Sequence, residues 1–245
     1  HYNMEANVYS VESFGASDGP GVRYIVFLQG CPMRCKYCHN VDSRAFGIGE
    51  KKTADELLTK ALRCKSYWKN GGGITLSGGE PLAQMEFATE FFRKAKAEGV
   101  HTTLDTSGCY YTEDEPFYSD FMELMKYTDL VMLDIKEINS ERHKAITGFD
   151  NKNILAMAKK LSDIGKPMWI RHVLVPGYTD FPEDLKALGD FCRSLKTLER
   201  FQILPYHTLG VFKWEKAGID YPLKDVVPPT AEHVKECEKL VGINA

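Results

Sequence analysis

Short apolar runs alternate with amphipathic segments along the 245-residue chain. Near-continuous runs rich in Val, Ile and Leu are typical of buried parallel strands. They predict strands at 22–28, 73–77, 101–105, 129–135, 168–175 and 200–206. Helical spacing predicts helices at 53–68, 82–98, 114–127, 151–164, 182–196 and 230–241. Six β-then-α units imply right-handed crossovers and a parallel sheet covered by helices.

Two of the predicted helices carry boundary signals. Thr53 and Glu56 have the spacing of a capping box at the start of the first helix. Pro81 is a favoured first-turn residue ahead of the second helix, and Gly99 is a typical residue just after a helix end.

Two architectures fit this pattern, an open doubly wound sheet and a β/α barrel. A dinucleotide-binding fold would carry a glycine-rich turn after the first strand, where this chain has a cysteine-containing loop at 30–40, the cysteine loop. Polar residues follow the ends of the predicted strands, at 77–80, 105–106, 134–136 and 206–207. A rim of functional groups is typical of a barrel. Six units favour a partial (β/α)6 barrel, open at one side, as a single domain over 1–245 with 208–245 covering it.

Composition narrows the class of protein. Hydrophobic residues make up 43% and charged residues 27%, and the net charge is -3. This disfavours a general nucleic-acid or acidic-membrane binder, and no apolar run reaches the length of a spanning helix. Seven cysteines, three of them crowded together, suit metal ligation in a reducing compartment better than a disulfide framework. We therefore expect a cytoplasmic protein.

Cys31, Cys35 and Cys38 form a C-x3-C-x2-C pattern that allows three interpretations. The thiols could be merely structural. They could hold zinc with His39 as a fourth ligand, although His39 directly follows Cys38, which makes one tetrahedron awkward. They could hold three irons of a [4Fe–4S] cluster and leave the fourth iron open for a small molecule. The third interpretation is favoured, and the remaining four cysteines, scattered singly, are assigned to no ligand role.

The cysteine pattern, with Tyr37 before the last cysteine and a strand before the first, resembles the radical S-adenosylmethionine superfamily. "SGGEP" at 77–81 is that superfamily's second mark. "SDGPGVR", "CHN", "LDTSG", "VMLDIK", "WIRHVLVPG" and "LPYHTLG" extend the resemblance to the pyruvate formate-lyase activating enzyme family over nearly the whole chain. The resemblance implies a partial barrel, a [4Fe–4S] cluster and S-adenosylmethionine. It also implies an oxidoreductase of anaerobic metabolism that generates a glycyl radical on pyruvate formate-lyase.

Three other functions are alternatives to this one. They are an activase of a different glycyl radical enzyme, a radical enzyme acting on a small molecule, and a zinc-stabilised binding module. Only about a dozen residues separate Asn40 from Thr53, with no second cysteine run, so the chain lacks the ferredoxin-like insertion of some activases.

The resemblance implies which residues contact the cofactor. Gly78, Gly79 and Glu80 suit the methionine amino group, because glycines allow close main-chain approach; a tight turn is the alternative. Lys136 would neutralise the cofactor carboxylate, and Arg171, a charge in an apolar strand, needs an inward partner or forms a structural ion pair. The other implied contacts are Tyr37, Cys38 and His39 along the adenine, His207 near the nucleoside, and Asp134 and Ile135 at the strand end.

A monovalent cation, sodium or potassium, is expected at the ends of two consecutive strands. Asp105 and Asp134 would be neighbouring carboxylates, and both cannot stay ionised cheaply without a cation. Thr106 and Met132 would add oxygen donors, and the resembling family places a cation here beside the cofactor carboxylate. The alternative is that Asp105 caps its own turn and Asp134 pairs with Lys136.

The turn "SDGPGVR" at 17–23 feeds the first strand, and in the resembling family it receives the partner's glycine-bearing strand. Asp18 is the candidate contact. The resemblance also implies flavodoxin or ferredoxin as the electron donor, and a monomer is expected.

Overall fold

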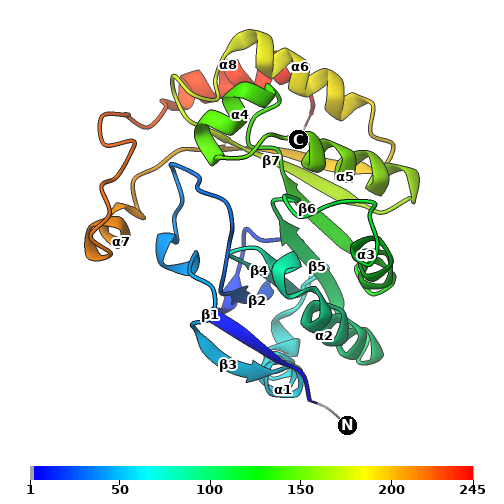
Figure 1. Cartoon of the computed structure of the whole chain (residues 1–245). Coiled ribbons are helices and arrows are strands. Elements are labelled where there is room, and N and C mark those ends of the chain that lie inside the picture. The colour runs from blue at the N-terminus through cyan, green and yellow to red at the C-terminus, as the bar shows by residue number, and fades with distance from the viewer. Residues whose placement is uncertain (1–2, 245) are drawn as a thin grey trace. The chain divides into compact units, whose positions relative to one another are not determined.

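The computed structural model describes residues 3–244, which divide into two compact units (Figure 1). Unit 1 comprises residues 3–32, 43–106 and 110–132, and unit 2 comprises 33–42, 107–109 and 133–244. None of the helices within the described residues is long and apolar enough to cross a membrane.

Eight strands form an open, mostly parallel sheet. They are β1 (Glu5–Gly15), β2 (Arg23–Leu28), β3 (Glu50–Thr53), β4 (Gly73–Gly78), β5 (His101–Thr106), β6 (Leu130–Asp134), β7 (Met168–Leu174) and β8 (Leu198–Pro205). Their order is β3-β1-β2-β4-β5-β6-β7-β8, so β3 and β8 end the sheet. The pairs β2–β4, β4–β5 and β7–β8 are parallel, whereas β1 is antiparallel to both β2 and β3. All six predicted strands are confirmed.

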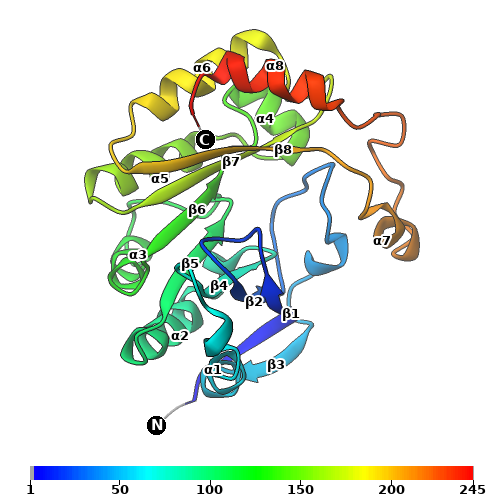
Figure 2. The same cartoon turned by 180° about the vertical axis from the view of Figure 1, so that it is seen from behind.

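The eight α-helices of the described residues include all six that were predicted. They are α1 (Ala54–Leu62), α2 (Met85–Ala97), α3 (Phe117–Lys126), α4 (Ser140–Thr147), α5 (Lys152–Asp163), α6 (Pro182–Arg193), α7 (Val211–Lys216) and α8 (Ala231–Val241). Short 3-10 turns occur at η1 (Val41–Ser43), η2 (Lys65–Tyr67) and η3 (Pro81–Gln84). In unit 1, α2 packs against α1 and α3, and in unit 2, α6 packs against α8 (Figures 1 and 2).

Two strands and two helices were not predicted, and each lacks a strong apolar signal. β1 buries only alternate residues at its start, Ala6 and Val8, as a strand with one covered face does. β3 is a polar edge strand of sequence EKKT, and charged edges discourage pairing with other chains. α4 and α7 are short, and each buries few apolar side chains.

The predicted helix boundaries are right at the capped ends and wrong where the turn tightens. Thr53 accepts from the Glu56 amide at 3.1 Å, and Glu56 accepts from the Thr53 amide at 2.8 Å, which confirms the capping box. The helix predicted at 53–68 ends at Leu62, because the apolar spacing stops and Tyr67 is 57% exposed. Gly99 follows the end of α2 with φ of 69°, as expected of a residue after a helix.

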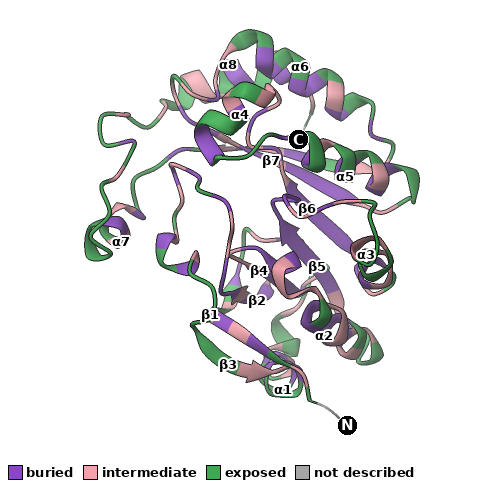
Figure 3. Ribbon diagram, in the orientation of Figure 1, coloured by how far each residue is buried: buried purple, intermediate pink, exposed green. Residues whose placement is uncertain are grey.

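The core of each unit lies on its central strands (Figure 3). In unit 1, Ile25, Ile74 and Leu104 are fully buried, and in unit 2, Ile170 and Leu174 are. These residues come from the apolar runs that predicted the strands, so burial of those runs accounts for the strand prediction.

The contact between α6 and α8 depends on one glycine of α6. A Cβ at Gly189 would lie 2.0 Å from the Val241 carbonyl oxygen at the end of α8. The same carbonyl accepts a hydrogen bond from Arg193 Nη1 at 2.9 Å, so α8 ends directly on the surface of α6.

We expect Gly189→Ala to lower the free energy of unfolding by about 2 kcal/mol, because the new methyl group overlaps main-chain atoms that cannot rotate away. Urea unfolding of the wild type and variant measures the difference. Ala187→Ser, on the exposed side of the same helix, is the control and should change stability by less than about 0.5 kcal/mol. Equal stability of Gly189→Ala and the wild type would contradict the close contact.

Candidate functional site

The "SGGEP" turn of unit 1 packs against the start of the cysteine loop. The amide of Gly79 donates to the Leu28 carbonyl and the amide of Glu80 donates to the Gly30 carbonyl, both at 2.8 Å. A Cβ at Gly79 would lie 2.3 Å from the Gly30 oxygen, and Gly78 has φ of 120°. Only glycines fit these two positions, so the turn is fixed by main-chain contact with the loop.

Glu80 is fully buried, and its carboxylate organises the turn. Its Oε2 accepts from the Leu82 amide at 2.9 Å, which caps η3, and from the Thr106 hydroxyl at 2.7 Å. Thr106, predicted as a cation ligand, therefore directs its hydroxyl hydrogen to Glu80. Sequence reasoning missed this link, although an acidic residue directly before a first-turn proline is a signal for an N-cap.

Asp105 lies at the end of β5 and is 9% exposed. Its Oδ2 accepts a hydrogen bond from Ser77 Oγ at 2.7 Å, across the β4–β5 pair. Met132, predicted beside the same site, is fully buried in β6. Asp105, Thr106 and Met132 belong to unit 1, and Asp134 belongs to unit 2.

The three cysteines of the loop are divided between the units. In unit 1, the Cys31 amide donates to the Arg44 carbonyl at 3.0 Å. In unit 2, the Cys38 amide donates to the Cys35 carbonyl at 3.2 Å, which makes a tight turn of Tyr37 and its neighbours. All three thiols are unbridged. Among residues 3–244, no three side chains of His, Cys, Asp or Glu are grouped as ligands of one metal ion.

A carboxylate between two cations marks the end of β6 in unit 2. Asp134 lies 3.2 Å from Lys136 Nζ and 3.6 Å from Arg171 Nε. Burial acts to raise the pKa of the Asp134 carboxyl, but the two cations outweigh it, and this pKa lies below its ordinary value. Burial likewise acts to lower the pKa of Lys136, but Asp134 raises it well above its ordinary value. Asp134 is therefore ionised at neutral pH and lies beside both cations.

His39 and His207, which the sequence places 168 positions apart, meet in unit 2. Their ring centroids lie 4.0 Å apart with 39° between the planes. Burial, then His207 and Lys213, lower the pKa of His39 to about 4, so its ring is neutral at pH 7. Tyr37 is 7% exposed, and its ring lies 5.6 Å from Lys136 Nζ. Burial raises the pKa of the Tyr37 hydroxyl far above its ordinary value.

The segment around α7, which sequence reasoning missed, contacts the same part of the cysteine loop. Trp214 Nε1 donates to the Cys38 carbonyl at 2.8 Å, and Lys213 Nζ donates to Asn40 Oδ1 at 2.7 Å. Gly210 lies so near His39 that a Cβ would approach its carbonyl oxygen to 2.7 Å. The aromatic and glycine residues just after "LPYH" were the available signal.

Two further contacts of unit 2 hold the segments around two predicted site residues, Cys35 and Ile135. The amides of Arg34 and Lys36 donate to the carbonyls of Thr147 and Ile146, at 2.9 and 3.0 Å, so the loop pairs with the end of α4. Ile135 is fully buried, and its carbonyl oxygen lies 2.9 Å from His172 Nδ1.

Asp18 lies in the turn between β1 and β2. Its carbonyl oxygen accepts from the Thr75 hydroxyl at 2.7 Å. The turn therefore belongs to unit 1 and is tied to β4 by a buried side chain.

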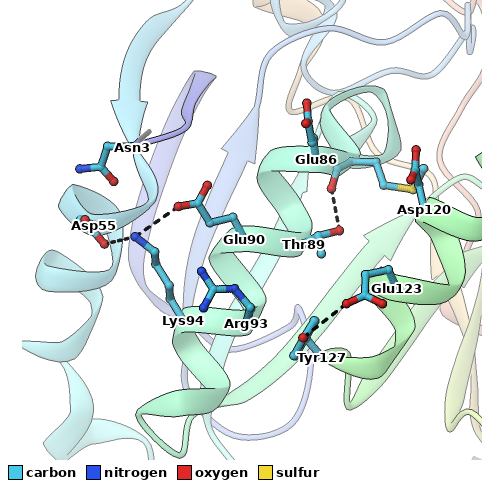
Figure 4. A pocket seen from close by; sticks show the side chains of 11 residues that line it. Asn3, Asp55, Glu86, Thr89, Glu90, Arg93, Lys94, Asp120, Glu123 and Tyr127 are labelled. Carbon is cyan, nitrogen blue, oxygen red and sulfur yellow. Dashed lines mark hydrogen bonds and ion pairs between the residues drawn. The ribbon is translucent and has the colours of Figure 1, made fainter. Parts of the chain in front are cut away.

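A pocket of unit 1 lies between α1, α2 and α3 (Figure 4). Lys94 forms ion pairs there with Asp55 and Glu90. No residue predicted for the cluster, the cofactor or the partner lines it, so we do not place the chemistry in this pocket.

Comparison with known proteins identifies the family of the chain. The model of the Radical SAM superfamily matches residues 25–192. The pyruvate formate-lyase-activating enzyme of Streptococcus mutans serotype c is 53% identical over 236 residues, which cover 96% of this chain and 90% of that protein. The enzyme of the same name from Staphylococcus epidermidis is 49% identical over 243 residues, covering 98% of this chain and 97% of that protein.

A solved structure supports the fold. A radical SAM methyltransferase from Sphaerobacter thermophilus superposes with a TM-score of 0.63 at 18% identity, over 91% of this chain and 65% of that chain. The predicted partial barrel of the α/β class is confirmed by this likeness and by the open, mostly parallel sheet. The chain belongs to the Radical SAM superfamily and, within it, to the family of pyruvate formate-lyase-activating enzymes.

Proposed function

We propose that this chain activates pyruvate formate-lyase by generating a radical on a glycine of that enzyme. The observation that carries the proposal is the 53% identity over 96% of the chain to an activating enzyme of that name. The same family match disfavours a zinc-stabilised binding module. An activase of another glycyl radical enzyme is the second candidate, because the chain's own residues do not name the partner.

Membership of the family implies a [4Fe–4S] cluster and S-adenosylmethionine. When bound, they supply one electron, cleavage of a sulfonium C–S bond and removal of a hydrogen atom from a glycine Cα. The protein's part is to hold them, exclude water and position the glycine.

The donor set of the cysteine loop fits such a cluster. Cys31, Cys35 and Cys38 are unbridged thiols, and each would hold a separate iron. The main-chain hydrogen bonds of Cys31 and Cys38 fix the loop without using the sulfur atoms. A fourth ligand from the chain would not be needed, because the remaining iron would be open to the amino and carboxylate groups of S-adenosylmethionine.

The charges of unit 2 fit the carboxylate of that cofactor. Lys136 and Arg171 both lie beside Asp134 at the end of β6, and a cofactor carboxylate bound there would meet two cations. Ile135, held by its main chain, continues this strand end. In unit 1, the main chain of Gly78, Gly79 and Glu80 would receive the amino group, since the Glu80 side chain is buried in the turn.

The paired rings of unit 2 fit the adenosyl part. His39 and His207 lie 4.0 Å apart with their rings tilted by 39°, and Tyr37 and Cys38 precede His39 in the same turn. A neutral imidazole can stack on adenine without loss of a hydrated charge. We assign these four residues to the adenine and its ribose.

We also propose a monovalent cation held by Asp105, Thr106, Met132 and Asp134. The support is the hard oxygen donor set on the successive strands β5 and β6. The ion pair of Asp134 with Lys136 agrees with the alternative, in which no cation is needed.

The remaining assignments concern partners. Asp18 is proposed to contact the glycine-bearing segment, and flavodoxin or ferredoxin is proposed to deliver the electron. We propose that the chain acts as a monomer, and the cysteine usage still predicts a cytoplasmic location.

The direct test is anaerobic incubation of the purified protein with reductant, S-adenosylmethionine and pyruvate formate-lyase, followed by electron paramagnetic resonance. We expect a glycyl-radical signal, and no signal from a pyruvate formate-lyase whose radical-site glycine is changed to Ala. Cleavage of S-adenosylmethionine without a glycyl signal would contradict the proposed partner, and a signal with another glycyl radical enzyme alone would establish the second candidate.

Replacing Cys31, Cys35 or Cys38 with Ala should remove most bound iron and abolish radical formation, because each thiolate holds one iron. Iron analysis and the glycyl-radical signal measure the two effects. Cys64→Ala is the control, since Cys64 is also unbridged and, like Cys31 and Cys38, only partly buried, but it lies outside the loop. Wild-type iron content in any of the three loop variants would exclude that cysteine as a ligand.

Binding of S-adenosylmethionine should depend on the identity of the monovalent cation at constant ionic strength. Sodium and potassium should support tighter binding than a bulky organic cation, and Asp105→Asn should weaken binding about tenfold and reduce this dependence. Asp129→Asn, which removes a carboxylate paired with Lys96, is the control. Cation-independent affinity, together with unchanged affinity in Asp105→Asn, would reject the cation.

A further inference from the structure

Arg23 of unit 1 is a fully buried cation that forms no ion pair within the described residues. Burying a guanidinium without compensation is costly, so its donors must be satisfied by other groups. Burial lowers the pKa of Arg23 to about 10, which still leaves it charged at pH 7. Hydrogen bonds donated by a charged group are stronger than those between neutral groups.

The guanidinium donates to acceptors from four segments of unit 1. Nε donates to Thr75 Oγ1 at 3.0 Å, and Nη2 donates to Thr103 Oγ1 at 2.9 Å. Nη1 donates to the carbonyls of Pro20 and Gly71, at 3.2 and 3.0 Å. The other acceptors are the Ile74 carbonyl and both the carbonyl and Nδ1 of His101.

Arg23 is linked to the turn at 17–22, here called the glycine loop, in two ways, directly and through Thr75. The Pro20 carbonyl is held directly by Nη1. Thr75 accepts from Arg23 Nε, so its one hydroxyl hydrogen is free to point away from the guanidinium, and it donates to the Asp18 carbonyl at 2.7 Å. Arg23 therefore orients a hydroxyl that in turn fixes Asp18.

The glycine loop depends on these hydrogen bonds for its shape, because the backbone of its glycines has little conformational preference of its own. Gly19 has φ of 128° and Gly21 has φ of 62°, conformations that glycine enters and leaves easily. A Cβ at Gly21 would lie 2.5 Å from the Lys69 carbonyl oxygen. The loop must contain glycines to fit, and it must be held by neighbouring donors to keep one shape.

We propose that Arg23 and Thr75 are positioning residues that hold the glycine loop in the shape in which it receives an extended, glycine-bearing segment of the partner. This inference rests on the proposed function, in which Asp18 contacts that segment. Neither residue touches the reacting atoms. Their effect is to order the main chain of Asp18 and Pro20 before the partner binds, so that binding does not have to order it.

Thr103 provides a matched control for Thr75. The two residues are aligned on the neighbouring parallel strands β4 and β5, both are fully buried, and both accept a hydrogen bond from Arg23. Only the Thr75 hydroxyl donates to the glycine loop. Thr75→Val and Thr103→Val thus each remove one hydroxyl that accepts from the same guanidinium, and only Thr75→Val also removes the hydrogen bond to the Asp18 carbonyl.

The experiment measures glycyl-radical formation against partner concentration, and S-adenosylmethionine cleavage without partner, for wild type, Thr75→Val, Thr75→Ser and Thr103→Val. We expect Thr75→Val to raise the KM for the partner about fivefold, as loss of one hydrogen bond does. Thr103→Val should change it less than twofold, and Thr75→Ser, which keeps the hydroxyl, should stay close to the wild type. Cleavage without partner should stay within twofold in all variants.

Equal KM values for Thr75→Val and Thr103→Val, at equal urea midpoints, would overturn the inference, because the Thr75 hydroxyl would then be only a core hydrogen bond. If Thr75→Val does not fold, a raised KM in Thr75→Ser would equally overturn it, since that variant retains the bond to Asp18. A wild-type protein that cleaves S-adenosylmethionine but forms no glycyl radical would instead overturn the proposed function.

Discussion

The close approach of Gly79 to the Gly30 carbonyl sets the geometry of unit 1 around the cysteine loop. Two successive amides of the "SGGEP" turn donate to the main chain of 28–30, and a side chain at Gly79 would force the segments apart. The Gly30 amide in turn donates to the Ser43 carbonyl at 2.8 Å, so the start of the loop is joined, within unit 1, to the segment that follows the loop. The "SGGEP" turn and the start of the cysteine loop are thus joined through their main chains.

In unit 2, ion pairs rather than close main-chain packing fix the end of β6. Asp134 lies beside Lys136 and Arg171 at the end of β6, and moving both cations into water would leave its half-buried carboxylate without them. Its neighbour Ile135 is fixed through both its amide and its carbonyl, so the charged side chains lie on an ordered strand end.

The sequence predicts those parts of the fold that short-range patterns determine. The six central strands follow from apolar runs because those runs are buried, and the capping box fixes the start of α1. Contacts between distant segments have no such pattern. Trp214 meets Cys38 across 176 positions, and the aromatic and glycine residues after "LPYH" do not indicate which distant segment they contact. Glu80 was assigned to the cofactor from its motif, but its side chain caps a turn and binds Thr106.

The elements with the weakest sequence signals hold the unit 2 part of the cysteine loop. α4 supplies the carbonyls that pair with Arg34 and Lys36, and α7 supplies the indole that binds the Cys38 carbonyl. Helices of 8 and 6 residues are unstable alone, so they form because of tertiary contacts, including these. The dependence is mutual, since the loop has no regular structure and its polar main-chain groups need partners. Order in α4, α7 and the cysteine loop therefore arises together, and the positions of Cys35 and Cys38 follow from it.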